Sequence, residues 1–356
     1  MKFLFENWNI KKGLKIKKLF INNYKVLKNF EIDFCDKNNN PLPIIVLAGI
    51  NGSGKTAVLE SIYGIKKIGG IRLETILDNE KKVFNSNTSA LAIGGEGIKQ
   101  FWYNDEIKGK IHYFSYQSSL RDIKNFLPEY IQKLVFEYDI KASEVYKKIR
   151  ENINDIFDSL NINIEFDSRD GKGNLFFKHK ITGEKFLIDE LSSGERTLIS
   201  EVLYLYLSNI KNMVILIDEP ELSLHPKWQS KILKLYEDYA IKNNCQIILA
   251  THSPLIIGSA KSEYLRVLNF EKNKVVVKKF NRSYGLEFNK ILLEIMGINN
   301  LRTEEVEKDF NKLREYILMK NWEKYKQLYN KMYSYLGEDV DLKLLNMQAR
   351  LKGFND

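Results

Sequence analysis

The sequence predicts an α/β fold that carries a short helical insertion and ends in an all-helical region. Short, unbroken apolar runs, typical of strands buried on both faces of a sheet, occur at residues 44–48, 214–217 and 246–250. Apolar residues recur at helical spacing from about residue 121 to residue 161. After residue 284, helical spacing continues to the end of the chain. These three observations set the fold class, and the remaining elements follow in chain order.

The first third of the chain predicts strands on either side of one helix. Residues 14–22 and 28–35 alternate apolar and polar side chains, which indicates half-buried strands. Residues 55–66 follow the first buried run and predict a helix. Several short strands, separated by glycines and by an Asn-Asp pair, are expected within residues 88–116.

The middle of the chain predicts two hairpins and a helix besides the buried runs. Residues 162–188 predict a hairpin whose loop is Ser168–Gly173. A helix is expected from about 194 to 207. Residues 264–270 and 275–280 indicate a closing hairpin. We therefore expect one domain over residues 1–284, with the helical arm at 121–161 inserted in it, and a helical domain over residues 285–356.

Composition excludes several classes of protein. The chain has 356 residues and a net charge of +9, but it has no apolar run of 18 residues, so we expect no membrane span. The N-terminus lacks the features of a signal peptide, which predicts a cytoplasmic protein. Its two cysteines, Cys35 and Cys245, cannot form a disulfide framework. Seven lysines between Lys11 and Lys28 indicate either an anionic partner such as nucleic acid or a solvated face.

A glycine-rich loop follows the first buried run and precedes the predicted helix. Gly49–Thr56 matches the pattern G-x-x-x-x-G-K-[ST] in full, and this pattern binds phosphates in that structural setting. Lys55 is expected to reach the β- and γ-phosphates, and the Thr56 hydroxyl to bind Mg²⁺. The sequence therefore predicts ATP and Mg²⁺ as ligands. The residues expected to hold the nucleotide are Asn51, Gly52, Ser53, Gly54, Lys55 and Thr56.

Two acids end the second buried run. Asp218 is expected to hold Mg²⁺, and Glu219 to orient and deprotonate the water that attacks the γ-phosphate. Two acids after a strand could also be a polar strand end. The phosphate-binding loop upstream favours the chemical interpretation.

Two further segments carry a resemblance to a known family. Leu191–Glu195 (LSSGE) resembles the LSGGQ signature of ABC-type ATPases, with Ser193 at a glycine position and Glu195 at the glutamine position. Thr251–Pro254 (THSP) resembles the switch-histidine segment of the same superfamily. The resemblance implies an ATPase head with a mixed sheet. It also implies that Ser192 and Gly194 contact the γ-phosphate bound to a second subunit, and that His252 senses that phosphate.

The resemblance implies two further contacts with the nucleotide. Gln117 is the candidate for the lid glutamine that binds the nucleotide and its metal, and Gln100 is an alternative. Lys25 matches a basic position that contacts phosphate in the SMC/Rad50 branch. Because lysines crowd this segment, a solvated Lys25 is the alternative interpretation.

The residues after the acids favour one branch of the superfamily. Residues 218–229 (DEPELSLHPKWQ) resemble the stand-alone SMC-like ATPases, which include RecF and the OLD proteins, and the resemblance covers roughly residues 14–282. The distance between Lys55 and Ser192 leaves room for a short arm and excludes an SMC coiled coil. Residues 284–306 resemble the tail of the ATPases in Septu- and retron-type defence systems.

This resemblance implies a homodimer or higher homo-oligomer that closes head to tail around ATP and regulates a separately encoded nuclease of the HNH or TOPRIM type. A RecF-like DNA-binding ATPase is the alternative, and an ABC transporter subunit is a third. The chain itself shows no convincing nuclease site. Asp339 and Asp341 have TOPRIM-like spacing, but we expect them in a solvated loop, and His112 and His179 are isolated.

Overall fold

The structure is a computed structural model that describes most of the chain in two units. The described residues are 13–64, 70–85, 107, 109–114, 123–136, 141–159, 162–170, 174–207, 210–222 and 224–354. The units are Met1–Ile291 and Leu292–Asp356. Residues 285–291 belong to the first unit, where the N–H of Gly285 donates to the carbonyl of Gly258 at 3.0 Å.

The first unit is built around a central sheet of six described strands, in the order β13-β12-β3-β11-β10-β6. All neighbours are parallel except β12 and β13, so the predicted mixed sheet is confirmed. Every residue of β3 and β11 is buried, as expected for strands covered on both faces. The strands are β3 (Ile44–Ala48), β6 (Ile111–Phe114), β10 (Val214–Asp218), β11 (Gln246–Thr251), β12 (Leu265–Glu271) and β13 (Lys274–Lys278).

A second, antiparallel sheet has the order β2-β1-β4-β5. The sequence predicted its first two strands, β1 (Leu14–Tyr24) and β2 (Leu27–Asp33), but not β4 (Ile71–Leu77) or β5 (Glu80–Asn85). The β5 strand buries none of its residues, so it carries little of the apolar alternation that identifies a strand. Asp78 and Asn79 join β4 to β5 with φ values of 51° and 74°, which suit a type I′ hairpin turn.

The predicted helical arm is confirmed as two helices, α3 (Ile123–Phe136) and α4 (Ala142–Ser159). A small sheet follows, with β7 (Ile164–Arg169) and β8 (Leu175–His179) as the predicted hairpin. A third strand, β9 (Lys185–Leu187), pairs with β8 and was not distinguished from the hairpin in the sequence. The sheet leads through a 3₁₀ turn, Ile188–Glu190, into α5 (Ser193–Leu207).

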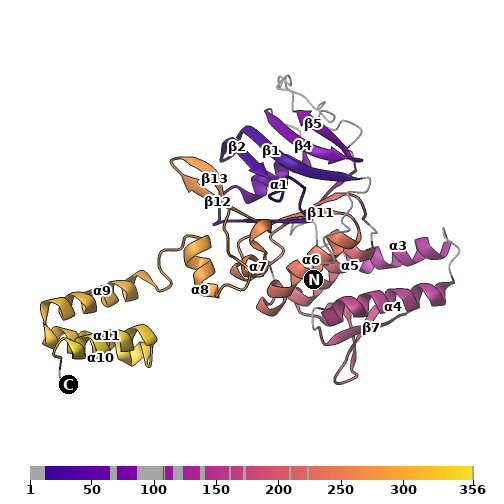
Figure 1. Cartoon of the computed structure of the whole chain (residues 1–356). Coiled ribbons are helices and arrows are strands. Elements are labelled where there is room, and N and C mark those ends of the chain that lie inside the picture. The colour runs from indigo at the N-terminus through magenta and orange to yellow at the C-terminus, as the bar shows by residue number, and fades with distance from the viewer. Residues whose placement is uncertain are drawn as a thin grey trace, which may run out of the picture. The chain divides into compact units, whose positions relative to one another are not determined.

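Helices cover the central sheet of this unit on both faces. The helix α1 (Lys55–Tyr63) lies between the central sheet and the antiparallel sheet, while α6 (Pro226–Lys242) and α7 (Pro254–Ser259) lie on the other side (Figure 1). His225 begins α6 as its N-cap: its side chain accepts from the N–H of Lys227, and Pro226 occupies the first turn. A 3₁₀ turn, Ser262–Tyr264, precedes β12.

The second unit is helical, as the sequence predicts. After the short α8 (Phe288–Lys290) and a π-helical turn, Ile291–Ile295, come α9 (Glu304–Met319), α10 (Trp322–Leu336) and α11 (Val340–Leu351). These last three helices bury a common apolar core that includes Phe310, Tyr325 and Leu345. Among the described residues, no helix has the length and apolarity needed to cross a membrane.

A buried lysine ties the N-terminal strand to the central sheet. Lys15 of β1 is fully buried and donates to the carbonyl of Asn244 at 2.5 Å, just before β11. Burial lowers the pKa of Lys15 from its ordinary value of 10.5 to about 7. Between these two values the unfolded chain binds a proton that the folded chain does not. This group therefore makes the free energy of unfolding rise as the pH rises from 7 to 10.5.

We expect Lys15→Met to remove this rise, which amounts to at most about 5 kcal/mol across the window. The measurement is chemical denaturation of both proteins between pH 7 and pH 10. Lys18→Met is the matched control, because Lys18 lies on the same strand and pairs with Glu31 at the surface. Parallel stability curves for the wild type and Lys15→Met would contradict the prediction.

Candidate nucleotide site

The glycine-rich loop connects β3 to α1, and its shape depends on two glycines. Gly49 has φ 151°, and a Cβ there would lie 2.6 Å from the carbonyl oxygen of Leu268. Gly54 has φ 97°, and a Cβ there would lie 2.8 Å from the side chain of Leu27. A Cβ on Gly52, by contrast, would meet nothing within 4 Å. The loop is therefore pressed onto the fold at both ends and open at Gly52, where a phosphate can approach the backbone.

Lys55 lies inside this loop. Its ammonium donates to the carbonyls of Gly49 at 2.8 Å and Ile50 at 3.1 Å. Burial lowers the pKa of Lys55, and the nearby carboxylates of Glu219, Glu221 and Asp218 oppose that shift. The ammonium is thus held among the carbonyls of the glycine-rich loop, where the sequence predicts that phosphate binds.

The two predicted metal ligands lie together although they are far apart in the sequence. The Thr56 hydroxyl donates to Oδ1 of Asp218 at 3.3 Å. Burial raises the pKa of Asp218, and hydrogen bonds from Thr56 and Tyr113 oppose that shift. A hydroxyl and a carboxylate on one side of a phosphate loop are oxygen donors of the kind Mg²⁺ takes alongside water and phosphate. The residues present therefore fit Mg²⁺.

Glu219 and His252 extend the same site. The strands β3, β11 and β10 are parallel neighbours, with Ala48 opposite Thr251 and Ala250 opposite Asp218, so their carboxyl ends meet at one edge. Nδ1 of His252 lies 3.4 Å from Oε1 of Glu219. Both side chains are partly exposed, so water can reach the Glu219 carboxylate.

The backbone of Glu219 adopts an unusual conformation for a residue with a Cβ. Its φ is 51°, in the left-handed region, and its N–H donates to the carbonyl of Ala250 at 2.9 Å. Such conformations cost on the order of 1 kcal/mol or more and concentrate at functional sites. The turn after β10 is therefore fixed by its pairing with β11, which aims Glu219 along the sheet edge.

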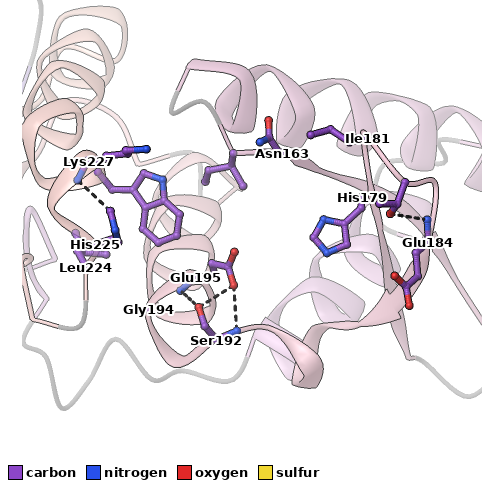
Figure 2. Close-up of a pocket in the computed structure, with 13 residues that line it drawn as sticks. Asn163, His179, Ile181, Glu184, Ser192, Gly194, Glu195, Leu224, His225 and Lys227 are labelled. Atoms are coloured by element: carbon purple, nitrogen blue, oxygen red, sulfur yellow. Dashed lines mark hydrogen bonds between the residues drawn. The ribbon is translucent and has the colours of Figure 1, made fainter.

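The signature segment forms a different surface. Ser192 donates through its hydroxyl to Oε2 of Glu195 at 2.7 Å, and the N–H of Glu195 donates back to the Ser192 hydroxyl at 3.3 Å. This reciprocal pair caps the start of α5. Ser192, Gly194 and Glu195 line a cavity of about 970 Å³ (Figure 2).

The cavity brings together three parts of the first unit. Besides the signature residues, it is lined from α6 and the turn before it by His225 and Lys227, and from the small sheet by His179 (Figure 2). Its lining includes no residue of the glycine-rich loop, and neither Asp218 nor His252. The signature segment therefore lines a cavity of its own, separate from the glycine-rich loop, Asp218 and His252.

Of the remaining residues predicted to contact the nucleotide, the structure describes only Lys25. Lys25 lies in the β1–β2 turn, whose Val26 and Leu27 side chains meet Gly54, and its ammonium forms an ion pair with Glu60 of α1. This puts Lys25 beside the loop, but its predicted contact with phosphate stays a prediction. Gln117 and Gln100 lie outside the described residues.

Two residues of the site were missed in the sequence. Tyr113 donates its hydroxyl to Oδ2 of Asp218 at 3.0 Å, and it can do so because β6 pairs with β10. Glu221 is buried against the His252 segment. The sequence offered one signal for Glu221, which is the third acid within residues 218–221, after Asp218 and Glu219. No motif indicates Tyr113, because the neighbour of β10 is decided by the sheet order.

The acids considered for a nuclease centre have another role. Asp339 caps α11, accepting from the N–H groups of Asp341 and Leu342, and Arg302 pairs with both Asp339 and Asp341. Across the described part of the chain, no group of three or more His, Cys, Asp or Glu side chains could hold a metal.

Comparisons with known proteins identify the family of this chain. A family model described as "AAA domain, putative AbiEii toxin, Type IV TA system" matches residues 77–258, just over half of the chain. The match begins after the glycine-rich loop and includes the signature segment, both acids and His252.

Two relatives and one solved structure extend the comparison. The chain is 38% identical over 98 residues to the retron Vc95 probable ATPase of Vibrio cholerae serotype O1 biovar El Tor, covering 24% of this chain and 19% of that protein. It is 28% identical over 251 residues to the Septu protein PtuA of Bacillus thuringiensis, covering 64% of this chain and 61% of that protein. An SMC head bound to the C-terminal winged-helix domain of ScpA is 15% identical, with a TM-score of 0.47, covering 75% of this chain and 98% of that one.

The chain thus spans less than two thirds of the length of these two relatives. The resemblance to Septu and retron ATPases that the sequence predicted is confirmed. Because the family match spans more than half of the chain and includes the acids and the histidine at the sheet edge, the chain belongs to this AAA domain family.

Proposed function

We propose that this protein binds ATP with Mg²⁺ and hydrolyses it to ADP and phosphate. The observation that carries the proposal is the convergence of Lys55, Thr56, Asp218, Glu219 and His252 at the carboxyl edge of β3, β11 and β10. These residue types supply a phosphate cradle, two metal ligands and a water-accessible carboxylate, which is what phosphoryl transfer to water requires.

In this proposal the chain's own residues divide the chemistry. The loop N–H groups and Lys55 hold the phosphates, and Thr56 and Asp218 would hold Mg²⁺, which would supply charge that neutralises the phosphates. Glu219 accepts a proton from a water molecule whose oxygen bonds to the γ-phosphorus, while the bond from that phosphorus to the β–γ bridging oxygen breaks. His252 contacts the γ-phosphate from the neighbouring strand end.

We further propose that each site is completed by a second copy of the chain. The separate cavity at Ser192 and the place of Ser192 and Gly194 at the N-terminus of α5 support this arrangement, because a helix N-terminus presents a positive dipole end to a phosphate. Two chains packed head to tail would bring the Ser192 of each against the nucleotide of the other. ATP then closes the pair, and hydrolysis reopens it.

The client of this cycle is proposed from the relatives. Septu and retron proteins are relatives, so we propose that the ATPase regulates a separately encoded nuclease of the HNH or TOPRIM type. Direct DNA binding through the lysine-rich first strand is disfavoured, because Lys15 and Lys17 are buried and Lys18 pairs with Glu31.

The test is the dependence of turnover on protein concentration. With saturating Mg²⁺ and ATP, the rate per chain should rise with concentration and level off where sedimentation detects the assembled state. A rate per chain that stays constant while the protein is monomeric would contradict the shared site. Co-purification with the product of a neighbouring nuclease gene, with and without ATP, tests the client.

A further inference from the structure

Glu221 lies two residues after Glu219 but differs from it in exposure and in hydrogen bonding. The Glu221 side chain is 4% exposed, against 33% for Glu219. Oε1 of Glu221 accepts three hydrogen bonds, all from the segment that carries the switch histidine. The donors are the Thr251 hydroxyl at 2.7 Å, the His252 N–H at 2.6 Å and the Ser253 N–H at 3.1 Å.

A second link joins the same two segments. The Ser253 hydroxyl donates to Oε1 of Gln229 on α6 at 2.7 Å, and Nε2 of Gln229 donates to the carbonyl of Leu224 at 2.9 Å. The same Ser253 hydroxyl accepts from the N–H of Ile256 as the N-cap of α7. The turn that follows the acids is thus fastened to the end of β11 at two points.

The imidazole of His252 faces both carboxylates. Its Nδ1 lies 3.1 Å from Oε1 of Glu221 and 3.4 Å from Oε1 of Glu219, without an aligned hydrogen bond to either. Two carboxylates beside Nδ1 favour a hydrogen on that nitrogen, which leaves Nε2 for the nucleotide. The two carboxylates differ in their access to solvent. Glu219 can contact water, whereas Glu221 contacts only its protein partners.

A carboxylate placed only for stability would be expected to satisfy both of its oxygens. Oε2 of Glu221 is buried and has no hydrogen-bond partner among the described residues. Leaving a buried polar atom unpaired costs about 1–3 kcal/mol. Glu237, which is similarly buried on α6, instead has partners at both oxygens: Oε1 accepts from Lys261 at 2.6 Å and from Tyr264 at 2.7 Å, and Oε2 lies 3.7 Å from the ammonium of Lys234.

We propose that Glu221 is a positioning residue for ATP hydrolysis: it holds the Thr251–Ser253 segment and orients the His252 ring toward the γ-phosphate. This inference rests on the proposed function, because it assigns Glu221 to act through His252. Carboxylates that orient a metal-ligating histidine are typically worth 10- to 100-fold in affinity or activity, and we expect an effect of that order here.

The first test needs no turnover. Hydrogen exchange of the peptide that contains Thr251–Ser253 should be faster in Glu221→Ala than in the wild type, because the His252 amide loses its acceptor and the Ser253 amide loses one of two, keeping the Thr251 hydroxyl. Glu237→Ala is the matched control, since it removes an equally buried carboxylate from α6. Unchanged exchange of this peptide in Glu221→Ala would overturn the proposal.

The second test is a double-mutant cycle on turnover. Glu221→Ala should lower kcat about 10- to 100-fold with little change in the KM for ATP. In a His252→Ala background the same substitution should add less than about a twofold loss, because residues that act as a unit are not additive. Glu221→Gln, which keeps an acceptor oxygen, should retain most of the rate.

The outcomes separate the two proposals. An equal loss from Glu221→Ala with and without His252 would overturn the positioning role while leaving ATP hydrolysis in place. If His252→Ala left turnover unchanged, the role of His252 in the proposed function would fail, and the inference about Glu221 would fail with it. If Glu221→Ala failed to fold, Glu221→Leu, which fills similar space but has no acceptor oxygen, would take its place in both measurements. Wild-type exchange together with a wild-type kcat in Glu221→Leu would then overturn the proposal.

Discussion

Replacing Glu219 with Gln is expected to lower ATP turnover by about 10²- to 10⁴-fold, the range typical of losing a general base. Gln keeps the shape of the side chain and meets the same left-handed backbone requirement at φ 51°, but it cannot accept the proton of the attacking water. ATP binding should persist, because Lys55, Thr56 and Asp218 are untouched. Dimers or larger assemblies should therefore accumulate in ATP. Single-turnover kinetics measures the loss of rate, and light scattering measures the assemblies.

The control is Glu263→Gln, which removes an exposed carboxylate from the 3₁₀ turn before β12. It should leave both turnover and assembly unchanged. If Glu219→Gln turned over ATP at the wild-type rate, Glu219 would not be the general base. Because Glu221 is buried and its Oε1 accepts three hydrogen bonds from the His252 segment, it is not positioned to take over that role.

The second large effect is expected at Ser192. Ser192→Arg should block hydrolysis without weakening ATP binding to the isolated subunit, since Ser192 lines a cavity separate from the phosphate-binding loop. The added side chain would fill the space where the nucleotide of the second copy is proposed to dock. ATP affinity at low protein concentration and turnover at high concentration are the two measurements.

Mixing two inactive variants gives a sharper form of this test. Lys55→Ala damages the phosphate loop, and Ser192→Arg damages the surface offered to the partner. In a mixed head-to-tail dimer, one of the two sites contains neither change. Equal mixing should restore up to about a quarter of the wild-type rate, given independent sites and random pairing in a two-fold dimer.

The control for added charge and bulk is Ser334→Arg on α10, which should not affect turnover. Full activity of Ser192→Arg at every concentration would show that hydrolysis does not need this surface. These two experiments together separate chemistry within one chain from assembly between chains.

Residues that are close in the sequence and obey a spacing rule could be identified without the structure. The buried run at 44–48, the loop Gly49–Thr56 and the helix after it form one continuous segment. Asp218 and Glu219 follow a buried run in the same way. Local backbone requirements, such as the left-handed φ of Gly54, confine these segments to a few residue types, and this makes them recognisable.

Some fold elements escaped the sequence analysis because their pattern is weak. The β5 strand is an edge strand that buries none of its residues and exposes Val83 as well as Glu80 and Lys81, so its apolar alternation is slight. The three-residue β9 strand is too short to show a period. Sheet pairing stabilises both strands, and pairing depends on partners that the local sequence does not specify.

The sequence by itself determined the phosphate loop, the pair of acids, the signature segment and the histidine, because each depends on neighbouring residues along the chain. Only the tertiary structure decided that Tyr113 supports Asp218, that Glu221 holds the His252 segment, and that Ser192 lines a separate cavity. Those relationships depend on which strands lie side by side. Strand order follows from the packing of the whole sheet, and it brings together residues more than 100 positions apart.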